Sequence, residues 1–378
     1  MKTPSIVVIL GNRPQFIKHA ALQRAWEGAE ERVRPIVVDT GQHYDYALAG
    51  VFLDELKIPT PDYSLGVGSA SHAEQLARML PEIEELLLRE KPASIIVYGD
   101  TNSTLGGALA AAKLNIPIAH IEAGLRSFDR TMPEEVNRVL TDHISSMLFC
   151  PTQIAVDNLE REGISGERVH LVGDVMTDVA QLLAPVADGR WPALQKRLGL
   201  PPDGTFGVVT IHRASNTEPE AMRELIDGLR AARIPLVFPM HPRTQAAFER
   251  SGLHVDLADL PNLRMLPPLG YVDLEALVRH SQCVLTDSGG LQKEAYIHGV
   301  PCITLRDTSE WLETIEAGMN VLVHTDPSRI AEAVLRVQNG EFERTAAKRP
   351  TLYGEGDAAA RILDVLFTHA HASVHLGL

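Results

Sequence analysis

The sequence predicts an α/β protein made of two Rossmann-like, doubly wound domains with a central cleft. Short β-branched, apolar runs alternate with helical stretches along the whole chain, which is typical of a parallel sheet covered by helices. The chain has 378 residues, of which 45% are hydrophobic, and this is enough material for two cores. The alternation also restarts near residue 206, after a stretch rich in Pro and Gly.

The first half contains six apolar runs that we interpret as strands of one sheet. They are Ser5–Leu10, Arg34–Thr40, Ser94–Tyr98, Pro117–Ile121, Ser146–Cys150 and His170–Gly173. Helices are expected between them. Thr101–Thr104 supply capping hydroxyl groups for an Ala-rich helix over Leu105–Leu114, and Pro133 suits the first turn of another helix.

The second half repeats this pattern after a linker-like region over Ala184–Asp203, for which a partly helical structure stays open. Its expected strands are Phe206–Ile211, Leu236–Met240, Arg264–Leu266, Cys283–Thr286 and Pro301–Leu305. We therefore expect an N-terminal domain over 1–178 and a C-terminal domain over 179–355. A final helix over 356–378 is expected to pack back on the N-terminal domain.

Composition and charge exclude several classes of function. The net charge is −14 and no dense Lys/Arg block occurs, so we expect neither a nucleic-acid nor a membrane partner. The three cysteines lie in or beside apolar runs without CxxC spacing, which indicates buried, reduced thiols. No apolar run reaches the length of a membrane span. We expect a soluble, cytoplasmic protein.

Three acids and one arginine are expected to meet at one edge of the first sheet. Asp100 and Glu122 each follow a predicted strand, and ligands of open α/β sheets bind beyond the carboxyl ends of the strands. Glu134 opens the helix that begins at Pro133, and Arg138 lies one turn further along. A simpler interpretation makes Asp100 a helix cap and Glu134 an acid that matches the helix dipole. It explains poorly why Glu122 is followed by AGLRS.

Cationic residues also occur at strand ends in both halves. Arg13 and Lys18 lie at the start of the helix after the first strand, so both can face the crevice. In the second half His212 and Arg213 follow a strand directly. A core histidine is the usual interpretation of a lone His, but the neighbouring Arg favours contact with an anion.

The stretch TDSGGLQKEA in the second half has the pattern of a phosphate site. Asp287 and Ser288 end a strand, and Gly289 and Gly290 permit close approach of the backbone where a helix begins. The free N–H groups and positive dipole end of that helix would bind phosphate. Glu294 lies one turn along, where a carboxylate could bind both hydroxyls of a ribose.

Along nearly its whole length the chain resembles the non-hydrolysing UDP-N-acetylglucosamine 2-epimerases. The resemblance depends on eight motifs in order, namely GNRPQFIK, TGQHYD, VYGDTNST, HIEAGLRS, MPEEVNR, HRASNTE, TDSGGLQKEA and LRDTSEW. It implies the two-domain architecture of B-type glycosyltransferases and an isomerase that needs no nicotinamide, metal or flavin cofactor. The implied substrate is a UDP-sugar, and we expect a homodimer.

The resemblance also implies a mechanism and roles for individual residues. UDP would leave C1 by anti elimination to give a 2-acetamidoglucal, and would add back after a proton arrives on the other face of C2. The implied catalytic residues are Asp100, Glu122, Glu134 and His212. The implied contacts with UDP and its diphosphate are Arg13, Lys18, Arg138, His212, Leu269, Leu274, Ser288, Gly289, Gly290, Glu294 and Arg306.

Three departures from the family pattern bear on the substrate. The first motif has Asn12 and Gln15 where GTRPE is common, and Trp311 stands where Arg is usual. The segment after TGQH has Asp45 and Tyr46. RPQFIK together with the EW pair is more similar to the branch that acts on UDP-2,3-diacetamido-2,3-dideoxyglucuronate. Gln15 would then tune the sugar pocket, unless it faces solvent on its helix.

Five functions remain open at this point. They are interconversion of UDP-N-acetylglucosamine with its manno epimer, the same chemistry on the diacetamido uronate, a hydrolysing epimerase, a retaining glycosyltransferase, and a silent nucleotide-sugar sensor. The intact acids Asp100, Glu122 and Glu134 favour an enzyme over a sensor, because a binding protein has no need of a proton shuttle.

Overall fold

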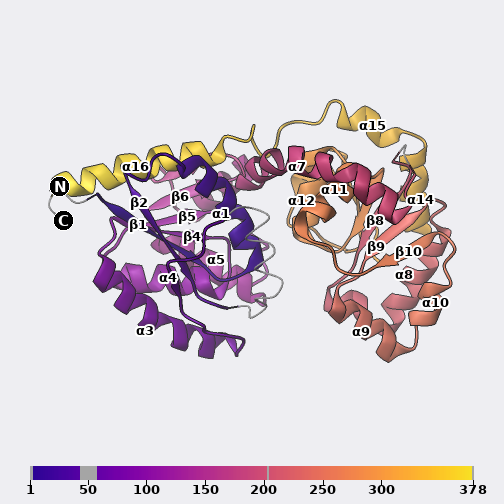
Figure 1. Ribbon diagram of the computed structural model, residues 1–378, viewed down its shortest axis with the longest axis horizontal. Helices are drawn as coiled ribbons and strands as arrows, with labels where there is room; N and C mark the ends of the chain where they lie inside the picture. The colour runs from indigo at the N-terminus through magenta and orange to yellow at the C-terminus, as the bar shows by residue number, and fades with distance from the viewer. Residues whose placement is uncertain (1–2, 43–57, 202–203, 377–378) are drawn as a thin grey trace. The chain divides into compact units, whose positions relative to one another are not determined.

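The computed structural model describes residues 3–42, 58–201 and 204–376, and the side chains at 214, 344 and 372–376 are not described. The chain folds as two compact units (Figure 1). Unit 1 comprises residues 1–179 and 352–378, and unit 2 comprises residues 180–351. Asp45 and Tyr46, which bear on the substrate prediction, lie outside the described residues.

Unit 1 is built on a parallel sheet with the strand order β3-β2-β1-β4-β5-β6-β7. The strands are β1 (Ser5–Leu10), β2 (Arg34–Asp39), β3 (Tyr63–Ser64), β4 (Ser94–Tyr98), β5 (Ile118–Ile121), β6 (Met147–Cys150) and β7 (Val169–Leu171). β1, β4, β5 and β6 are buried along their whole length, because helices cover a parallel sheet on both faces. The six predicted strands are confirmed to within a few residues, whereas the two-residue β3 was not predicted.

Most helices of unit 1 begin at a capping side chain or at a proline. They are α1 (Arg13–Trp26), α3 (His72–Glu90), α4 (Asn102–Lys113), α5 (Pro133–Ile144), α6 (Gln153–Arg161) and α16 (Ala358–Leu376). Thr101 and Thr104 form a capping box at the start of α4, and Pro133 is the first residue of α5. α16 packs on α1, where the rings of Phe367 and Trp26 are 5.5 Å apart (Figure 1).

Unit 2 contains a second parallel sheet with the order β10-β9-β8-β11-β12-β13. Its strands are β8 (Gly207–Thr210), β9 (Leu236–Pro239), β10 (Leu263–Leu266), β11 (Cys283–Thr286), β12 (Cys302–Thr304) and β13 (Asn320–Leu322). The helical elements are η1 (Ala214–Thr217), α8 (Pro219–Ala231), α9 (Pro242–Ser251), α10 (His254–Ala258), α11 (Tyr271–Arg279), α12 (Gly289–His298), α13 (Leu312–Glu316), α14 (Pro327–Gln338) and α15 (Glu341–Ala346). The five predicted strands of this half are confirmed, and β13 was not predicted.

The linker-like region expected over Ala184–Asp203 is helical as far as Leu198. Helix α7 spans Val175–Leu198 and continues through two prolines. Its buried residues Leu183, Ala187, Trp191, Leu194 and Leu198 recur every three or four positions. This apolar stripe outweighs the loss of two backbone N–H donors, and Trp191 is further fixed by stacking on Phe206 and His280.

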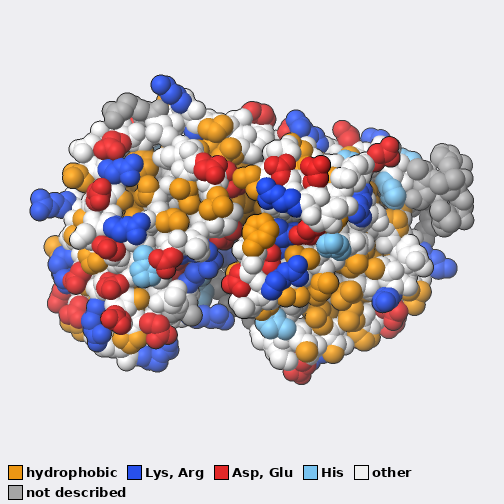
Figure 2. All heavy atoms as spheres, turned by 180° about the vertical axis from the view of Figure 1, so that it is seen from behind, with side chains coloured by type: hydrophobic (Ala, Val, Ile, Leu, Met, Phe, Trp, Pro, Cys, Tyr) orange, Lys and Arg blue, Asp and Glu red, His pale blue; other side chains and the backbone are white. Residues whose placement is uncertain are grey.

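The surface carries charged side chains of both signs. On the face shown in Figure 2, acidic and basic side chains are interspersed over each unit. None of the described helices combines the length and the apolar composition needed to cross a membrane.

Candidate active site

The ends of β4 and β5 bring two of the predicted acids together in unit 1. The strands are paired in register, with Tyr98 opposite Ile121, so the residues that follow them lie side by side. A Cβ at Gly99 would lie 3.2 Å from Glu122 Oε2, which shows how closely that carboxylate approaches the turn after β4. Glu122 itself has a φ of +72°. Such a backbone costs about 1–3 kcal/mol for a residue other than Gly, and it aims this side chain.

Each of these two acids forms an ion pair with a predicted cationic residue. Lys18 Nζ donates to Glu122 Oε2, and Arg138 Nη2 donates to Asp100 Oδ2. All four side chains are at least two-thirds buried. Asp100, Glu122, Lys18 and Arg138 therefore form one cluster of alternating charge, which can move a proton or receive a negatively charged ligand.

The electrostatics keep Arg138 charged. Burial lowers the pKa of Arg138, but the negative charge and hydrogen bond of Asp100 and the charges of Glu135 and Glu122 outweigh it, so the pKa is raised overall.

The adjacent acids Glu134 and Glu135 lie in different surroundings. Glu134 is exposed at the start of α5 and makes no hydrogen bond or ion pair with another described residue. Glu135 is buried, and it accepts hydrogen bonds from Ser127 N at 2.8 Å, Ser127 Oγ at 2.9 Å and Phe128 N at 3.1 Å. It also accepts from Arg138 Nη1 at 3.0 Å. Glu135 thus holds both the loop after β5 and the arginine that contacts Asp100.

Sequence reasoning missed Glu135, although a signal for it was present. Residues 135, 139 and 142 fall on one face of α5, and Glu135, Val139 and Asp142 are all buried. Glu135 lies on the buried face of α5 and is therefore the structural acid. Its exposed neighbour Glu134 is the acid that can reach a ligand.

A buried charge network beneath the cluster was also missed. His120 Nδ1 lies 2.6 Å from Asp142 Oδ1, and its Nε2 donates to the Gly99 carbonyl at 2.8 Å. Arg126 Nη1 donates to Asp142 Oδ2 at 2.7 Å. Burial raises the pKa of Asp142, but the charges and hydrogen bonds of His120 and Arg126 lower it overall. The network joins the end of β4, the strand β5, the loop after it and α5, so it fixes the frame that carries Glu122.

Gln15 is buried, and both ends of its side-chain amide form hydrogen bonds within the protein. Its side chain is buried, with Oε1 accepting from Gly11 N at 2.8 Å. Its Nε2 donates to the Tyr98 carbonyl at 2.8 Å and lies 3.0 Å from the hydroxyls of Thr101 and Thr104. The alternative in which Gln15 faces solvent is wrong. Its contacts tie α1 to the end of β4, beneath Asp100, and this favours a structural role over the predicted tuning of the sugar pocket. Arg13, by contrast, is exposed at the start of α1.

In unit 2 His212 is oriented by a buried acid. Its Nδ1 lies 2.9 Å from Asp287 Oδ1, while its own backbone N–H and that of Arg213 also donate to the Asp287 carboxylate. Burial raises the pKa of Asp287, but the hydrogen bond and charge of His212 and these backbone donors lower it overall. The contact at Nδ1 leaves Nε2 of the half-exposed ring to a ligand.

His212 also lines a cavity of about 540 Å³ in unit 2. Arg243 and Arg250 line the same cavity, together with Pro242 and Thr244 of α9. Three nitrogen-bearing side chains around one opening suit an anionic ligand.

The predicted phosphate turn has the expected geometry. Ser288 caps α12, where its Oγ accepts from Leu291 N at 3.4 Å, and Gly289 and Gly290 are the first helical residues. Glu294 lies one turn along and accepts a hydrogen bond from Tyr271 OH at 2.9 Å. Of the two leucines predicted to contact UDP, Leu269 lies in the loop before α11 and Leu274 lies on α11, and both are half-buried.

The last predicted cation, Arg306, pairs with an acid that was not predicted. Arg306 Nη1 lies 2.8 Å from Glu310 Oε2, and Arg213 Nη2 lies 3.8 Å from Glu310 Oε1. His212, Arg213, Arg306 and the start of α12 thus lie at the carboxyl ends of β8, β11 and β12, which are neighbours in the sheet.

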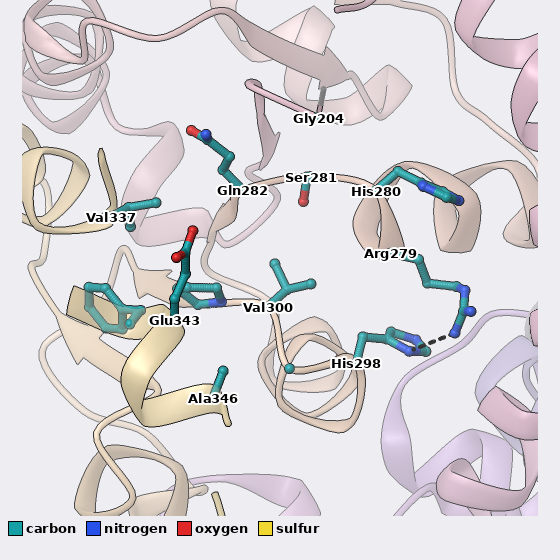
Figure 3. Close-up of a pocket in the computed structure, with 13 residues that line it drawn as sticks. Gly204, Arg279, His280, Ser281, Gln282, His298, Val300, Val337, Glu343 and Ala346 are labelled. Atoms are coloured by element: carbon teal, nitrogen blue, oxygen red, sulfur yellow. Dashed lines mark hydrogen bonds between the residues drawn. The ribbon is translucent and has the colours of Figure 1, made fainter. Parts of the chain in front are cut away.

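A second cavity, of about 340 Å³, contains none of the predicted residues. Figure 3 shows it lined by Gln282 and Ser281, which precede β11, with Val300 and His298 from the region before β12. It therefore lies at the amino edge of the second sheet, opposite the edge that carries His212 and Ser288.

Two Rossmann-like units with charged groups at the carboxyl ends of their strands define the class of fold. The calicheamicin glycosyltransferase CalG4 shares it, with a TM-score of 0.61 at 15% identity over 98% of each chain. A family profile described as UDP-N-acetylglucosamine 2-epimerase matches residues 27–367. The chain belongs to this family.

Two relatives show how close the match is. The UDP-2,3-diacetamido-2,3-dideoxy-D-glucuronate 2-epimerase of Pseudomonas aeruginosa is 44% identical over 367 residues, which is 96% of this chain and 99% of that protein. The crystal structure of the Methanocaldococcus jannaschii UDP-GlcNAc 2-epimerase, in complex with UDP-GlcNAc and UDP, has a TM-score of 0.85 and 39% identity. It covers 96% of this chain and 99% of that chain.

Proposed function

We propose that the protein interconverts UDP-N-acetylglucosamine and UDP-N-acetylmannosamine, by elimination and re-addition of UDP. The observation that carries this proposal is the cluster of unit 1, in which Lys18–Glu122 and Arg138–Asp100 pairs lie at the ends of neighbouring strands. A binding protein would gain little from two partly buried acids at this edge. An enzyme that moves a proton at a sugar carbon needs them.

The proposed reaction begins with loss of the C2 proton to a carboxylate. The C1–O bond breaks at the same time, and its electron pair leaves with UDP, which gives a 2-acetamidoglucal. A proton then arrives at C2 on the opposite face, and UDP adds back to C1. We assign the proton transfers to Asp100, Glu122 and Glu134, whose positions at strand and helix ends suit groups that exchange protons with a ligand.

The departing UDP gains negative charge, and preorganised cations are well suited to stabilise it. In unit 2 we assign this role to His212, Arg306 and the N-terminus of α12, with Ser288, Gly289 and Gly290 around the diphosphate. Glu294 would contact the ribose hydroxyls, and Leu269 and Leu274 would also contact UDP. In unit 1, we assign contacts with UDP to Arg13, Lys18 and Arg138.

A second substrate is supported by one specific observation. The relative that is 44% identical is named for the 2,3-diacetamido uronate, whereas the Methanocaldococcus jannaschii enzyme, 40% identical, is named for UDP-N-acetylglucosamine. The elimination at C1–C2 is the same in both cases. The two substrates differ by an amide at C3 and a carboxylate at C6.

The test offers each UDP-sugar separately and resolves the product epimers by NMR. We expect a mixture of the gluco and manno forms of UDP-N-acetylglucosamine with no net loss of UDP-sugar, and no such mixture with Asp100→Asn. Conversion of the uronate alone would identify the second substrate. Accumulation of free sugar and UDP would indicate a hydrolysing enzyme, and UDP binding without turnover of either sugar would contradict the proposal.

A further inference from the structure

Glu310 places a carboxylate at the start of α12, which is where the proposed function places the diphosphate. A Cβ at Gly289 would collide with Glu310 Oε1, so this oxygen lies directly against the first residue of the helix. The free N–H groups and the positive dipole end of a ten-residue helix attract an anion at this point. The Glu310 carboxylate is an anion at this point.

The two arginines of the site face the same carboxylate. Arg306 lies 2.8 Å from Glu310 Oε2 and Arg213 lies 3.8 Å from Oε1. Arg306 is only 12% exposed. Even so, no acceptor in the described part of the chain completes a hydrogen bond with its Nη1, because the contact with Glu310 is close but poorly aligned. The Glu310 carboxylate balances the positive charge of the two arginines but does not accept a hydrogen bond from Arg306 Nη1. The larger diphosphate could do both.

The backbone on either side of Glu310 is anchored. Ser309 Oγ donates to Gln292 Oε1 of α12 at 2.6 Å, and Trp311 N donates to Ser309 Oγ at 3.0 Å. Ser309 and Trp311 are buried, whereas Glu310 between them is half-buried. The Glu310 side chain can therefore rotate away from α12 while its backbone stays in place.

We propose that Glu310 is a placeholder for the diphosphate of the UDP-sugar, and that it must leave the start of α12 before the ligand binds. This inference rests on the proposed function. The carboxylate separates the like charges of Arg213 and Arg306 while the site is empty. It then competes with the phosphates, since two anions a few ångströms apart repel each other strongly in a partly buried site. Competition of this kind weakens UDP binding and promotes its release.

The test compares UDP binding to the full-length protein and to Glu310→Gln by isothermal titration calorimetry. The amide keeps the shape of the side chain and removes its charge. We expect at least ~10-fold tighter UDP binding in Glu310→Gln, and no more than ~2-fold change for uridine, which has no phosphate. Glu310→Ala should also bind UDP more tightly, and it serves if the amide variant does not fold. Glu316→Gln is the matched control, because Glu316 is exposed on nearby α13 and its change of charge is the same.

The outcomes separate this inference from the proposed function. If the unchanged protein does not bind UDP, the proposed function fails. If it binds UDP while both Glu310 variants bind UDP equally or more weakly, Glu310 contributes to binding and the placeholder role is wrong. An equal gain for UDP and uridine, or the same gain in Glu316→Gln, would also overturn the inference, because the effect would not act on the diphosphate.

Discussion

The substitution Glu135→Gln should distinguish a residue that holds the site in place from residues that take part in the reaction. The carboxylate of Glu135 accepts three hydrogen bonds from Ser127 and Phe128 and one from Arg138. A glutamine keeps a single acceptor oxygen, so its NH₂ group must face one of these donors. Hydrogen bonds to a charged group are worth about 1.5–3 kcal/mol each. We expect the loss of one such bond and the weakening of the others to lower the unfolding free energy of unit 1 by about 2–4 kcal/mol.

The effect on turnover follows from Arg138. This side chain joins Glu135 to Asp100, so without Glu135 the acid loses its fixed partner. We expect kcat to fall ~10–100-fold in Glu135→Gln, along with the loss of stability measured by denaturant unfolding. The adjacent Glu134→Gln is the matched control. It should cut kcat at least ~100-fold while unfolding changes by less than ~0.5 kcal/mol, because Glu134 is exposed. Normal kcat and stability in Glu135→Gln would refute the reasoning.

Three further predictions concern unit 1. Asp100→Asn and Glu122→Gln should each cut kcat at least ~100-fold while calorimetry still detects UDP binding, and near-normal rates in both would contradict their role. Burial lowers the pKa of His19 to about 4. As the pH falls from 6.5 to 4 the unfolded chain therefore binds a proton that the folded chain does not, and the unfolding free energy should drop by about 1.4 kcal/mol per pH unit. His19→Asn should remove this part of the slope, and identical slopes would show that His19 does not titrate this way. Gln15→Glu puts an acid oxygen near the Tyr98 carbonyl, so it should destabilise unit 1 by about 1–3 kcal/mol, and unchanged unfolding would refute this.

The strands could be predicted from the sequence because a parallel sheet is buried on both faces. Runs such as Ser94–Tyr98 and Cys283–Thr286 are mostly apolar and are followed directly by Gly or Asp, so residue type alone indicates where each strand ends. β3 has only two residues, and β13 begins with Asn320 and is only partly buried, so neither has such a pattern. The acids after β4 and β5 were predictable for the same reason, since parallel strands deliver their following residues to one edge.

The misses share a physical cause, which is that burial of polar groups depends on distant partners. From the sequence Gln15 could be a surface or a site residue. In the structure it donates a hydrogen bond to the Tyr98 carbonyl, 83 positions away, and this partner could not be predicted. The prolines of α7 are typical of a linker, but burial of residues such as Leu183 and Trp191 stabilises the helix in spite of them. Glu310 lies in a loop after β12, and nothing in its neighbours along the chain indicates that it lies against Gly289.

Reaction in D₂O tests the central claim most directly, because elimination and re-addition must exchange the C2 proton. The proposal predicts deuterium at C2 of both the product and the recovered UDP-sugar, observed by NMR and mass spectrometry during turnover. Deuterium is expected in the recovered substrate because the glycal can regain a proton on either face and because the epimerisation is reversible. Confirmed epimerisation without deuterium at C2 of either species would contradict the proton transfer assigned to Asp100, Glu122 and Glu134.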